Sequence, residues 1–372
     1  MAKDQIVLFF HSIYPRKTGG MEVYNYHLAQ ELLSDNYNNI IMLTGTKDYV
    51  DNKKVFYVND RLFGITRWGL GYLSILLSCL FSNKIILRDW KSVLIPYTSN
   101  FDLNAWPILF FKYLFNFNYS IHCHGGSARN WKYPRLQCFF FHKAFRIAAV
   151  SETIIYEYSK RTGCHIDYLP PIVRFNEASI DRSNICAKYH LNTFKKIILY
   201  VGSLKTLKSP ETLLLAFSSL DIKILEQQNV CLVLAGEGEL YPDLRSKYKH
   251  NKRIIFLGNV PNHKVHELYK ICDIYVICSW FEGTPISLLE AMYNNCCCIG
   301  TNVQGIKSII KDGDNGFLFP KNNNTILTAI LLNLLTNPNM VDDIGERANN
   351  YFNNHFSIDT HIKQMLEFVD YN

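Results

Sequence analysis

The sequence lacks the features that mark several protein classes. Its 11 cysteines include no pair at C-x-x-C spacing, so we expect no structural zinc site. Their odd number fits a reducing cytoplasm better than a disulfide framework. Three of them, Cys296 to Cys298, are consecutive in an apolar run, where we expect small buried hydrophobic residues. The start of the chain shows no apolar stretch with a small-residue cleavage site, so we expect no signal peptide.

A dinucleotide-binding fingerprint is incomplete. The segment LAGEGEL (234–240) ends an apolar run and holds Gly236 and Gly238, but Tyr241 stands where G-x-G-x-x-G needs its third glycine. NAD binding is therefore disfavoured, whereas a glycine-lined phosphate loop is still possible.

Acidic residues are scarce in the first half of the chain. Residues 1–171 carry 19 Lys and Arg against 12 Asp and Glu, whereas residues 172–372 carry 20 of each. The segment 129–146, RNWKYPRLQCFFFHKAFR, holds five Lys and Arg, six aromatic residues and no acid. Nucleic acid, anionic lipid and phosphate-bearing substrates can all attract such a surface. The uncharged run 68–83 is too short to span a bilayer and suits an interfacial segment or a core helix.

Apolar runs of strand length alternate with helical patterns along the chain. In the first half, strands are expected at residues 5–10, 39–44, 92–97, 119–124, 146–151 and 165–170. In the second half, they are expected at residues 196–202, 230–238, 254–258, 274–278 and 296–300. This alternation is typical of an α/β fold with parallel, doubly wound sheets.

The alternation breaks around Pro170 and Pro171, where polar residues follow. We therefore predict two Rossmann-like domains, residues 1–171 and 172–355, facing across a cleft, because such sheets bind ligands at the carboxyl ends of their strands. The tail 356–372 repeats apolar residues at helical spacing and is expected to form a helix that can pack back on the first domain.

The segment WFEGTPISLLEAM (280–292) carries the signature of an anion-binding helix start. Thr284 is a suitable N-cap, Pro285 suits the first helical position, and Gly283 lets the backbone come close to a ligand. The free N–H groups and the dipole of such a helix start attract an anion.

Two glutamates and a lysine accompany this helix start. Glu290 lies about 7.5 Å along the helix axis beyond Pro285, where it can accept hydrogen bonds from ribose hydroxyls while a diphosphate occupies the tip. Glu282, in the preceding loop, would face the group attached to the diphosphate. In GSLKTLKSP (202–210), Lys208 can neutralise a diphosphate leaving group. The alternatives are surface glutamates beside an ordinary capped helix and a solvated lysine.

The ordered set of motifs resembles the donor domain of retaining glycosyltransferase family 4, whose architecture is called GT-B. The set runs Gly202…Lys208, AGEGEL, FLGNVP, two glutamates separated by seven residues, and GIKSIIKDGDNGFLFP. The match is dense over residues 196–320. It implies that Lys208 holds the diphosphate, Glu282 contacts the sugar, Glu290 binds the ribose and the backbone near Val260 reads the base. The expected donor-binding residues of this half are Gly202, Ser203, Gly238, Val260, Gly283, Thr284, Pro285 and Glu290.

The first half adds two thinner matches. KTGGMEVY (17–24), with Gly19 and Gly20, resembles the glycine loop that lets the N-terminal domain of the family approach the diphosphate. His124, in HCHGG at the end of an expected strand, resembles the family histidine near the donor sugar. A hydrogen-bonded loop histidine is its alternative, and His122 is the weaker candidate.

The chain departs from the family pattern at two places. Ser203 stands where the family has arginine, which shifts the burden of holding the diphosphate onto Lys208 or a nearby lysine such as Lys205. The interdomain motif reads PPIVRFN (170–176) instead of Pro-Asn-Gly-Val-Asp. Asp312-Gly-Asp314 is interpreted as a turn between a helix and a strand, so no metal is expected.

The resemblance predicts a retaining glycosyltransferase of hexosyltransferase type, with a UDP- or GDP-sugar as donor and no cofactor. It implies a front-face mechanism in which the leaving phosphate accepts the proton of the acceptor hydroxyl. A nucleotide-sugar epimerase on the same fold and a non-catalytic glycan- or nucleic-acid-binding relative are the alternatives.

The excess of positive charge in residues 1–171 indicates that the acceptor binds to this half of the chain. We predict that Arg129, Lys132 and Arg135 contact a membrane surface or a lipid-diphosphate-linked glycan, and we expect no nucleic-acid partner. The protein would then be cytoplasmic and peripheral at the inner face of the cell membrane. Abundant Asn, Ile, Lys and Tyr suggest a bacterial role in surface polysaccharide synthesis, such as O-antigen, capsule or lipopolysaccharide.

Overall fold

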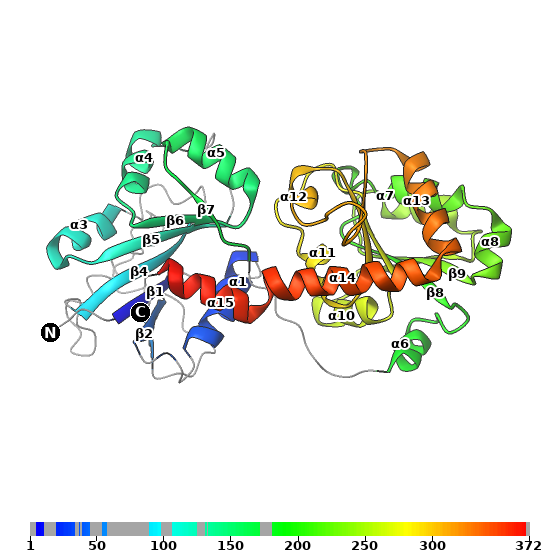
Figure 1. The fold of residues 1–372 in the computed structure, drawn as a ribbon, viewed down its shortest axis with the longest axis horizontal. Coiled ribbons are helices and arrows are strands. Elements are labelled where there is room, and N and C mark those ends of the chain that lie inside the picture. The colour runs from blue at the N-terminus through cyan, green and yellow to red at the C-terminus, as the bar shows by residue number, and fades with distance from the viewer. Residues whose placement is uncertain are drawn as a thin grey trace. The chain divides into compact units, whose positions relative to one another are not determined.

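The computed structural model describes residues 5–10, 20–33, 37, 39–44, 54–57, 89–97, 106–124, 131, 133–171 and 181–369. The chain divides into two compact units. Unit 1 holds Met1–Ile172 together with Ile358–Asn372, and unit 2 holds Val173–Ser357 (Figure 1).

Unit 1 is built on a parallel sheet in the order β3-β2-β1-β4-β5-β6-β7. Its strands are β1 (Gln5–Phe10), β2 (Ile40–Thr44), β3 (Val55–Tyr57), β4 (Trp90–Tyr97), β5 (Asn118–Cys123), β6 (Arg146–Ala149) and β7 (Asp167–Tyr168). Its described helices are α1 (Gly20–Leu32), α3 (Trp106–Phe115), α4 (Pro134–His142), α5 (Glu152–Thr162) and α15 (Ile358–Phe368).

Both faces of this sheet are covered, because successive strand residues point to opposite sides. Val7 packs into the core shared with α3, α4 and α5, whereas Ile6 and Leu8 pack against α1 and α15. The C-terminal helix α15 contributes Met365 to the second core, so the end of the chain belongs to unit 1.

Unit 2 repeats the arrangement with a parallel sheet in the order β10-β9-β8-β11-β12-β13. Its strands are β8 (Lys196–Val201), β9 (Val230–Ala235), β10 (Ile254–Gly258), β11 (Ile274–Ile277), β12 (Cys297–Thr301) and β13 (Phe317–Phe319). Its helices are α6 (Arg182–Lys188), α7 (Pro210–Ser218), α8 (Ile222–Gln227), α9 (Tyr241–Tyr248), α10 (Asn262–Lys270), α11 (Ile286–Tyr293), α12 (Gln304–Lys307), α13 (Asn324–Thr336) and α14 (Pro338–Phe356).

The three consecutive cysteines illustrate how this sheet is packed. Cys296 and Cys298 lie in the core on the side of α10 and α11, and Cys297 lies in the core on the side of α7 and α13. All three are fully buried, which confirms that they act as small hydrophobic residues. The strand order of both sheets is that of a doubly wound Rossmann-like fold, as predicted.

Candidate active site

The candidate site of unit 2 lies where the strand order changes direction. β8 is followed along the chain by β9 on one side but pairs with β11 on the other, so the loops after β8 and β11 diverge from a common edge. In open parallel sheets a ligand crevice forms at such a switch point, outside the carboxyl ends of the strands. Lys208 follows β8, and Glu282 follows β11.

The structure brings Lys208 and Glu282 into direct contact. The Lys208 Nζ atom donates to Glu282 Oε1 at 2.6 Å. A short 3-10 helix, Thr206–Lys208, delivers the lysine, and Ser209 then takes a left-handed conformation (φ 45°) before Pro210 opens α7. The lysine side chain is 36% exposed and the glutamate side chain 12% exposed. An ammonium group therefore lies at the surface of the site on a carboxylate that is largely shielded from water.

Asn322 joins the two loops that carry this pair. The backbone N–H of Trp280 donates to the carbonyl of Leu207 at 2.9 Å. The Trp280 indole N–H donates to Asn322 Oδ1 at 2.7 Å, and the Ser209 hydroxyl donates to the same oxygen at 3.4 Å. Sequence reasoning missed Asn322, whose only signal is its place in the polar run KNNNT, and its contacts tie the two loops together.

Glycines allow the loops of the site to lie against one another. A Cβ on Gly238 would be 2.4 Å from the Leu204 carbonyl oxygen, which is too close for any side chain. A Cβ on Gly305, at the start of α12, would be 2.1 Å from the carbonyl oxygen of Gly283. Gly238 therefore serves loop packing in this structure, a role that its prediction as a donor-binding residue did not include. Gly202, at the end of β8, has φ 155° and donates its N–H to the Ala235 carbonyl at 3.0 Å.

The start of α11 differs by one residue from the prediction. Pro285 is the N-cap, with φ −74° and ψ 103°, and the helix begins at Ile286. Thr284 was predicted to be the cap, but the extended conformation of Pro285 delays the first helical residue, and no side-chain hydrogen bond caps the helix. The N-terminus of α11 still follows directly on the loop that carries Glu282, and the first N–H groups of a helix have no partner within it.

Glu290 lies on α11 in a largely buried environment. Its side chain is 18% exposed, and its Oε1 atom lies 3.9 Å from Nδ1 of His266 on α10. Burial raises the pKa of Glu290 to about 7, and the interaction with the Tyr269 hydroxyl opposes this shift. Val260 lies in the loop between β10 and α10 and packs against the hydrophobic core on the side of α10 and α11.

Ser203 stands where the resemblance leads us to expect an arginine. The Tyr200 hydroxyl donates to the Ser203 carbonyl at 3.1 Å, which fixes the backbone there. Lys205 is exposed, and Glu239 accepts from the backbone N–H of Thr206 at 3.1 Å in the same turn. Among the described residues of these loops, Lys208 is thus the cation in contact with Glu282.

In unit 1, His124 belongs to a buried aromatic cluster at the end of β5. Its ring centroid lies 4.3 Å from those of Tyr24 and His122, and the Tyr24 hydroxyl is 3.1 Å from Nε2 of His361 on α15. Burial, with a contribution from His122 and His361, lowers the pKa of His124 well below its usual value. Burial also lowers the pKa of His122 to about 4. His124 Nε2 is buried and has no hydrogen-bond partner in the described part of the chain.

The structure locates the remaining predicted residues as follows. Gly20 begins α1. Several predicted residues lie outside the described part of the chain, namely Gly19, the run 68–83, Arg129, Lys132 and residues 172–176 of the interdomain motif. Arg135 is exposed on α4.

The Asp312-Gly-Asp314 segment is a turn, as predicted. Gly313 has φ 75°, Asp312 accepts from the N–H of Leu318 at 2.9 Å, and Asp314 lies 3.8 Å from Arg347. Within the described ranges, no group of three or more His, Cys, Asp or Glu residues is arranged to hold a metal ion.

Solved structures with the same fold cover nearly all of the chain. A glycosyltransferase from Rickettsia africae matches with a TM-score of 0.75 and 16% identity over 99% of this chain and 98% of that one. Anabaena HepE, solved with UDP and glucose, matches with a TM-score of 0.71 and 14% identity over 98% and 99%. At these identities the likeness defines the fold, which is the GT-B architecture predicted from the sequence.

The sequence match to a known family lies in unit 2. Residues 181–351 match the model of the glycosyl transferases group 1, which covers a little under half of the chain. An α-1,4-N-acetyl-D-galactosaminyltransferase of Campylobacter jejuni, named for a PP-undecaprenol-linked acceptor, is 30% identical over 59% of this chain and 57% of its own length. A diphosphoundecaprenol α-1,3-galactosyltransferase of Escherichia coli is 29% identical over 34% and 33%. The chain thus spans about half or less of the length of these relatives.

Proposed function

We propose that this protein is a retaining glycosyltransferase that uses a nucleotide-diphosphate sugar, with UDP or GDP as the nucleotide. The observation that carries the proposal is the contact between Lys208 and Glu282, 2.6 Å long, at the switch point of a group 1 domain. A cation is needed there because negative charge grows on the diphosphate as the sugar leaves.

The chemistry assigns a different task to each side chain. The bond between the anomeric carbon and the diphosphate oxygen breaks, and a bond from the acceptor hydroxyl oxygen to the same carbon forms on the same face. The leaving phosphate oxygen takes the proton of that hydroxyl. Lys208 and the N-terminus of α11 stabilise the diphosphate, Glu282 contacts the sugar and Glu290 accepts hydrogen bonds from the ribose.

The acceptor of this reaction is proposed to be a glycan on a lipid diphosphate at the inner face of the cell membrane, in bacterial surface polysaccharide synthesis. The relatives named for undecaprenol-linked acceptors support this class of acceptor. The cationic excess of residues 1–171 supports a peripheral position at an anionic surface. In the described part of the chain, no helix has the length and apolar character needed to cross a bilayer.

A screen of nucleotide-sugars for slow donor hydrolysis tests the proposal. We expect one UDP- or GDP-sugar to release nucleotide and free sugar, and NMR of the first product formed should show the anomer of the donor. An inverted anomer would refute the retaining assignment. Isomerisation of the sugar nucleotide without its cleavage would indicate an epimerase, and binding without turnover of any donor would indicate a non-catalytic relative.

A further inference from the structure

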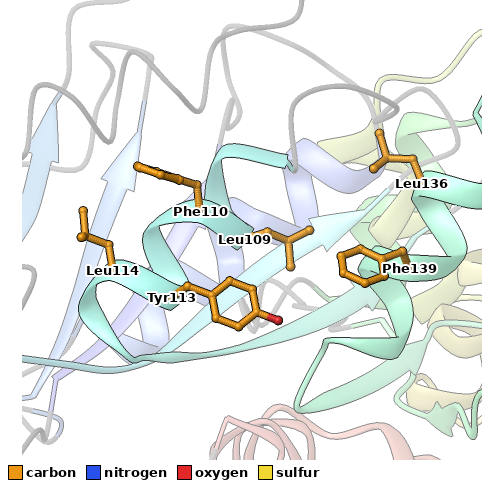
Figure 2. A pocket seen from close by; sticks show the side chains of 6 residues that line it. All are labelled: Leu109, Phe110, Tyr113, Leu114, Leu136 and Phe139. Atoms are coloured by element: carbon orange, nitrogen blue, oxygen red, sulfur yellow. The ribbon is translucent and has the colours of Figure 1, made fainter.

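An apolar groove of about 440 Å³ opens on the surface of unit 1 between α3 and α4. We call this surface the α3–α4 face. Figure 2 shows the side chains that line it, with the rings of Tyr113 and Phe139 pointing toward one another and Phe110 and Leu114 on the side of α3 away from α4. Its lining residues are Leu109, Phe110, Tyr113, Leu114, Leu136 and Phe139.

Four of the six residues of this face are exposed in a way that folding of unit 1 does not require, whereas Leu109 belongs to the core. Phe110, Tyr113 and Leu114 are 57%, 63% and 58% exposed, and Phe139 is 48% exposed. The opposite side of α3 already supplies the core, since Ile108 and Phe111 are 1% and 2% exposed. A helix that is apolar on all sides is normally buried on all sides, and a clustered apolar surface marks an interaction site.

Cations border the α3–α4 face. The Nζ atom of Lys143 lies 5.6 Å from the ring centre of Phe139, and the Nζ atom of Lys112 lies 5.3 Å from that of Tyr119. Burial, together with the charge of Lys143, lowers the pKa of Lys112. Arg135 is exposed beside the lining residue Leu136, and the helices α3 and α4 contain no acidic residue. Among the described residues, no carboxylate forms a salt bridge with these three cations.

This combination distinguishes between the possible partners. An anionic bilayer offers both an apolar layer for the ring and leucine side chains and phosphate groups for the cations at their border. A second copy of the chain would bring the same uncompensated cations together, which opposes association. Single-stranded nucleic acid stacks on aromatic rings, but half of the lining residues are leucines, which offer no ring.

We propose that the α3–α4 face inserts its apolar side chains into the headgroup–acyl boundary of an anionic membrane, with Lys112, Arg135 and Lys143 at the level of the phosphates. The proposal rests on the proposed function, because an enzyme must bind the membrane to reach a membrane-borne acceptor. It goes further, since it assigns the docking to one surface and to apolar insertion as well as charge.

Co-sedimentation of the full chain with vesicles of phosphatidylglycerol and phosphatidylcholine tests the proposal. The double variant Phe110→Ser/Tyr113→Ser should bind about tenfold more weakly at both low and high salt, because apolar insertion is not screened. Arg135→Ser and Lys143→Ser should each weaken binding about fivefold, and only at low salt. The variant Arg129→Ser/Lys132→Ser/Arg135→Ser should show the same salt-sensitive loss.

The matched control is Tyr156→Ser/Ile222→Ser. These side chains are 63% and 55% exposed, like those of Tyr113 and Phe110, but lie on α5 and α8. This control should bind vesicles like the wild type. The Phe110→Ser/Tyr113→Ser, Lys143→Ser and control variants should hydrolyse the donor at the wild-type rate in the absence of vesicles, which separates this test from that of the proposed function.

Three results would overturn the proposal. Equal losses in the groove and control variants would mean that the face has no special role. A wild-type protein that hydrolyses the donor but does not bind anionic vesicles would exclude membrane docking. The Phe110→Ser/Tyr113→Ser variant could also lose self-association or binding of single-stranded nucleic acid while its vesicle binding is unaffected. That result would assign the α3–α4 face to another partner.

Discussion

Replacing Lys208 with alanine should lower kcat by about 10²–10³-fold, or about 2.7–4 kcal/mol, which is typical for loss of one electrostatic stabiliser. Two features favour the upper end of this range. Position 203 is a serine, so the family's second cation is missing. The variant would also leave the Glu282 carboxylate, only 12% exposed, without the ammonium group that lies 2.6 Å away, and this carboxylate would face the diphosphate.

The fold itself should tolerate this change. Because the Lys208 side chain is 36% exposed, its ion pair with Glu282 contributes about 1 kcal/mol or less to stability. Lys188 provides a matched control, since its side chain is 43% exposed and its Nζ atom lies 2.5 Å from Glu267, whose side chain is 15% exposed. Lys188→Ala should change the melting temperature about as much as Lys208→Ala but leave kcat unaltered.

Steady-state kinetics of donor hydrolysis, with thermal unfolding of both variants, measures the two effects separately. A double-mutant cycle with Glu282→Gln adds the coupling energy between the two side chains. A Lys208→Ala enzyme with nearly normal kcat would mean that another cation holds the diphosphate. Equal losses of kcat in the Lys208 and Lys188 variants would mean that the effect is structural, and either result refutes the reasoning.

Two further changes probe the neighbours of this pair. Glu290→Ala should chiefly raise the donor KM, by about tenfold or more, because hydrogen bonds to the ribose stabilise ground and transition states alike. Burial raises the pKa of Glu290 to about 7, so the carboxylate that accepts these bonds is lost as the pH falls through that value. The donor KM of the wild type should therefore rise as the pH falls from about 8 to 6, whereas the donor KM of Glu290→Gln should not change with pH. The same pH dependence of KM in both enzymes would contradict the assignment. Asn322→Ala should lower kcat about tenfold by releasing the loops of Lys208 and Glu282. Asn323→Ala, which removes the cap of α13, should cost about 1 kcal/mol of stability and leave kcat unchanged; the reverse pattern would exclude a positioning role for Asn322.

Local patterns were enough to predict most of the fold. The apolar runs 5–10 and 254–258 are strands β1 and β10 with the predicted bounds, although β10 is an edge strand whose middle residues are only partly buried. β3 was missed, since its three residues Val55–Tyr57 are too few to form a pattern. The exact start of α11 also escaped prediction, because it depends on the ψ angle of Pro285 and not on residue type alone.

The candidate site was predictable in its members but not in its contacts. The motif order singled out Lys208 and Glu282, but only the fold brings side chains 74 positions apart to a hydrogen-bonding distance. The raised pKa of Glu290 depends on burial beneath neighbouring elements, which no residue type reports. In unit 1, the contact between Tyr24 and His361 joins residues 337 positions apart, so the tail could be predicted as a helix but not as a partner of α1.

The central claim is that the loops after β8 and β11 of unit 2 bind the nucleotide-sugar. Hydrogen exchange measured by mass spectrometry, with and without saturating UDP or GDP, tests it most directly. The account predicts that one of these nucleotides protects the backbone of residues 202–209 and 282–290, where the loop of Lys208 and the start of α11 would hold the diphosphate. Protection confined to residues 1–171 would contradict it.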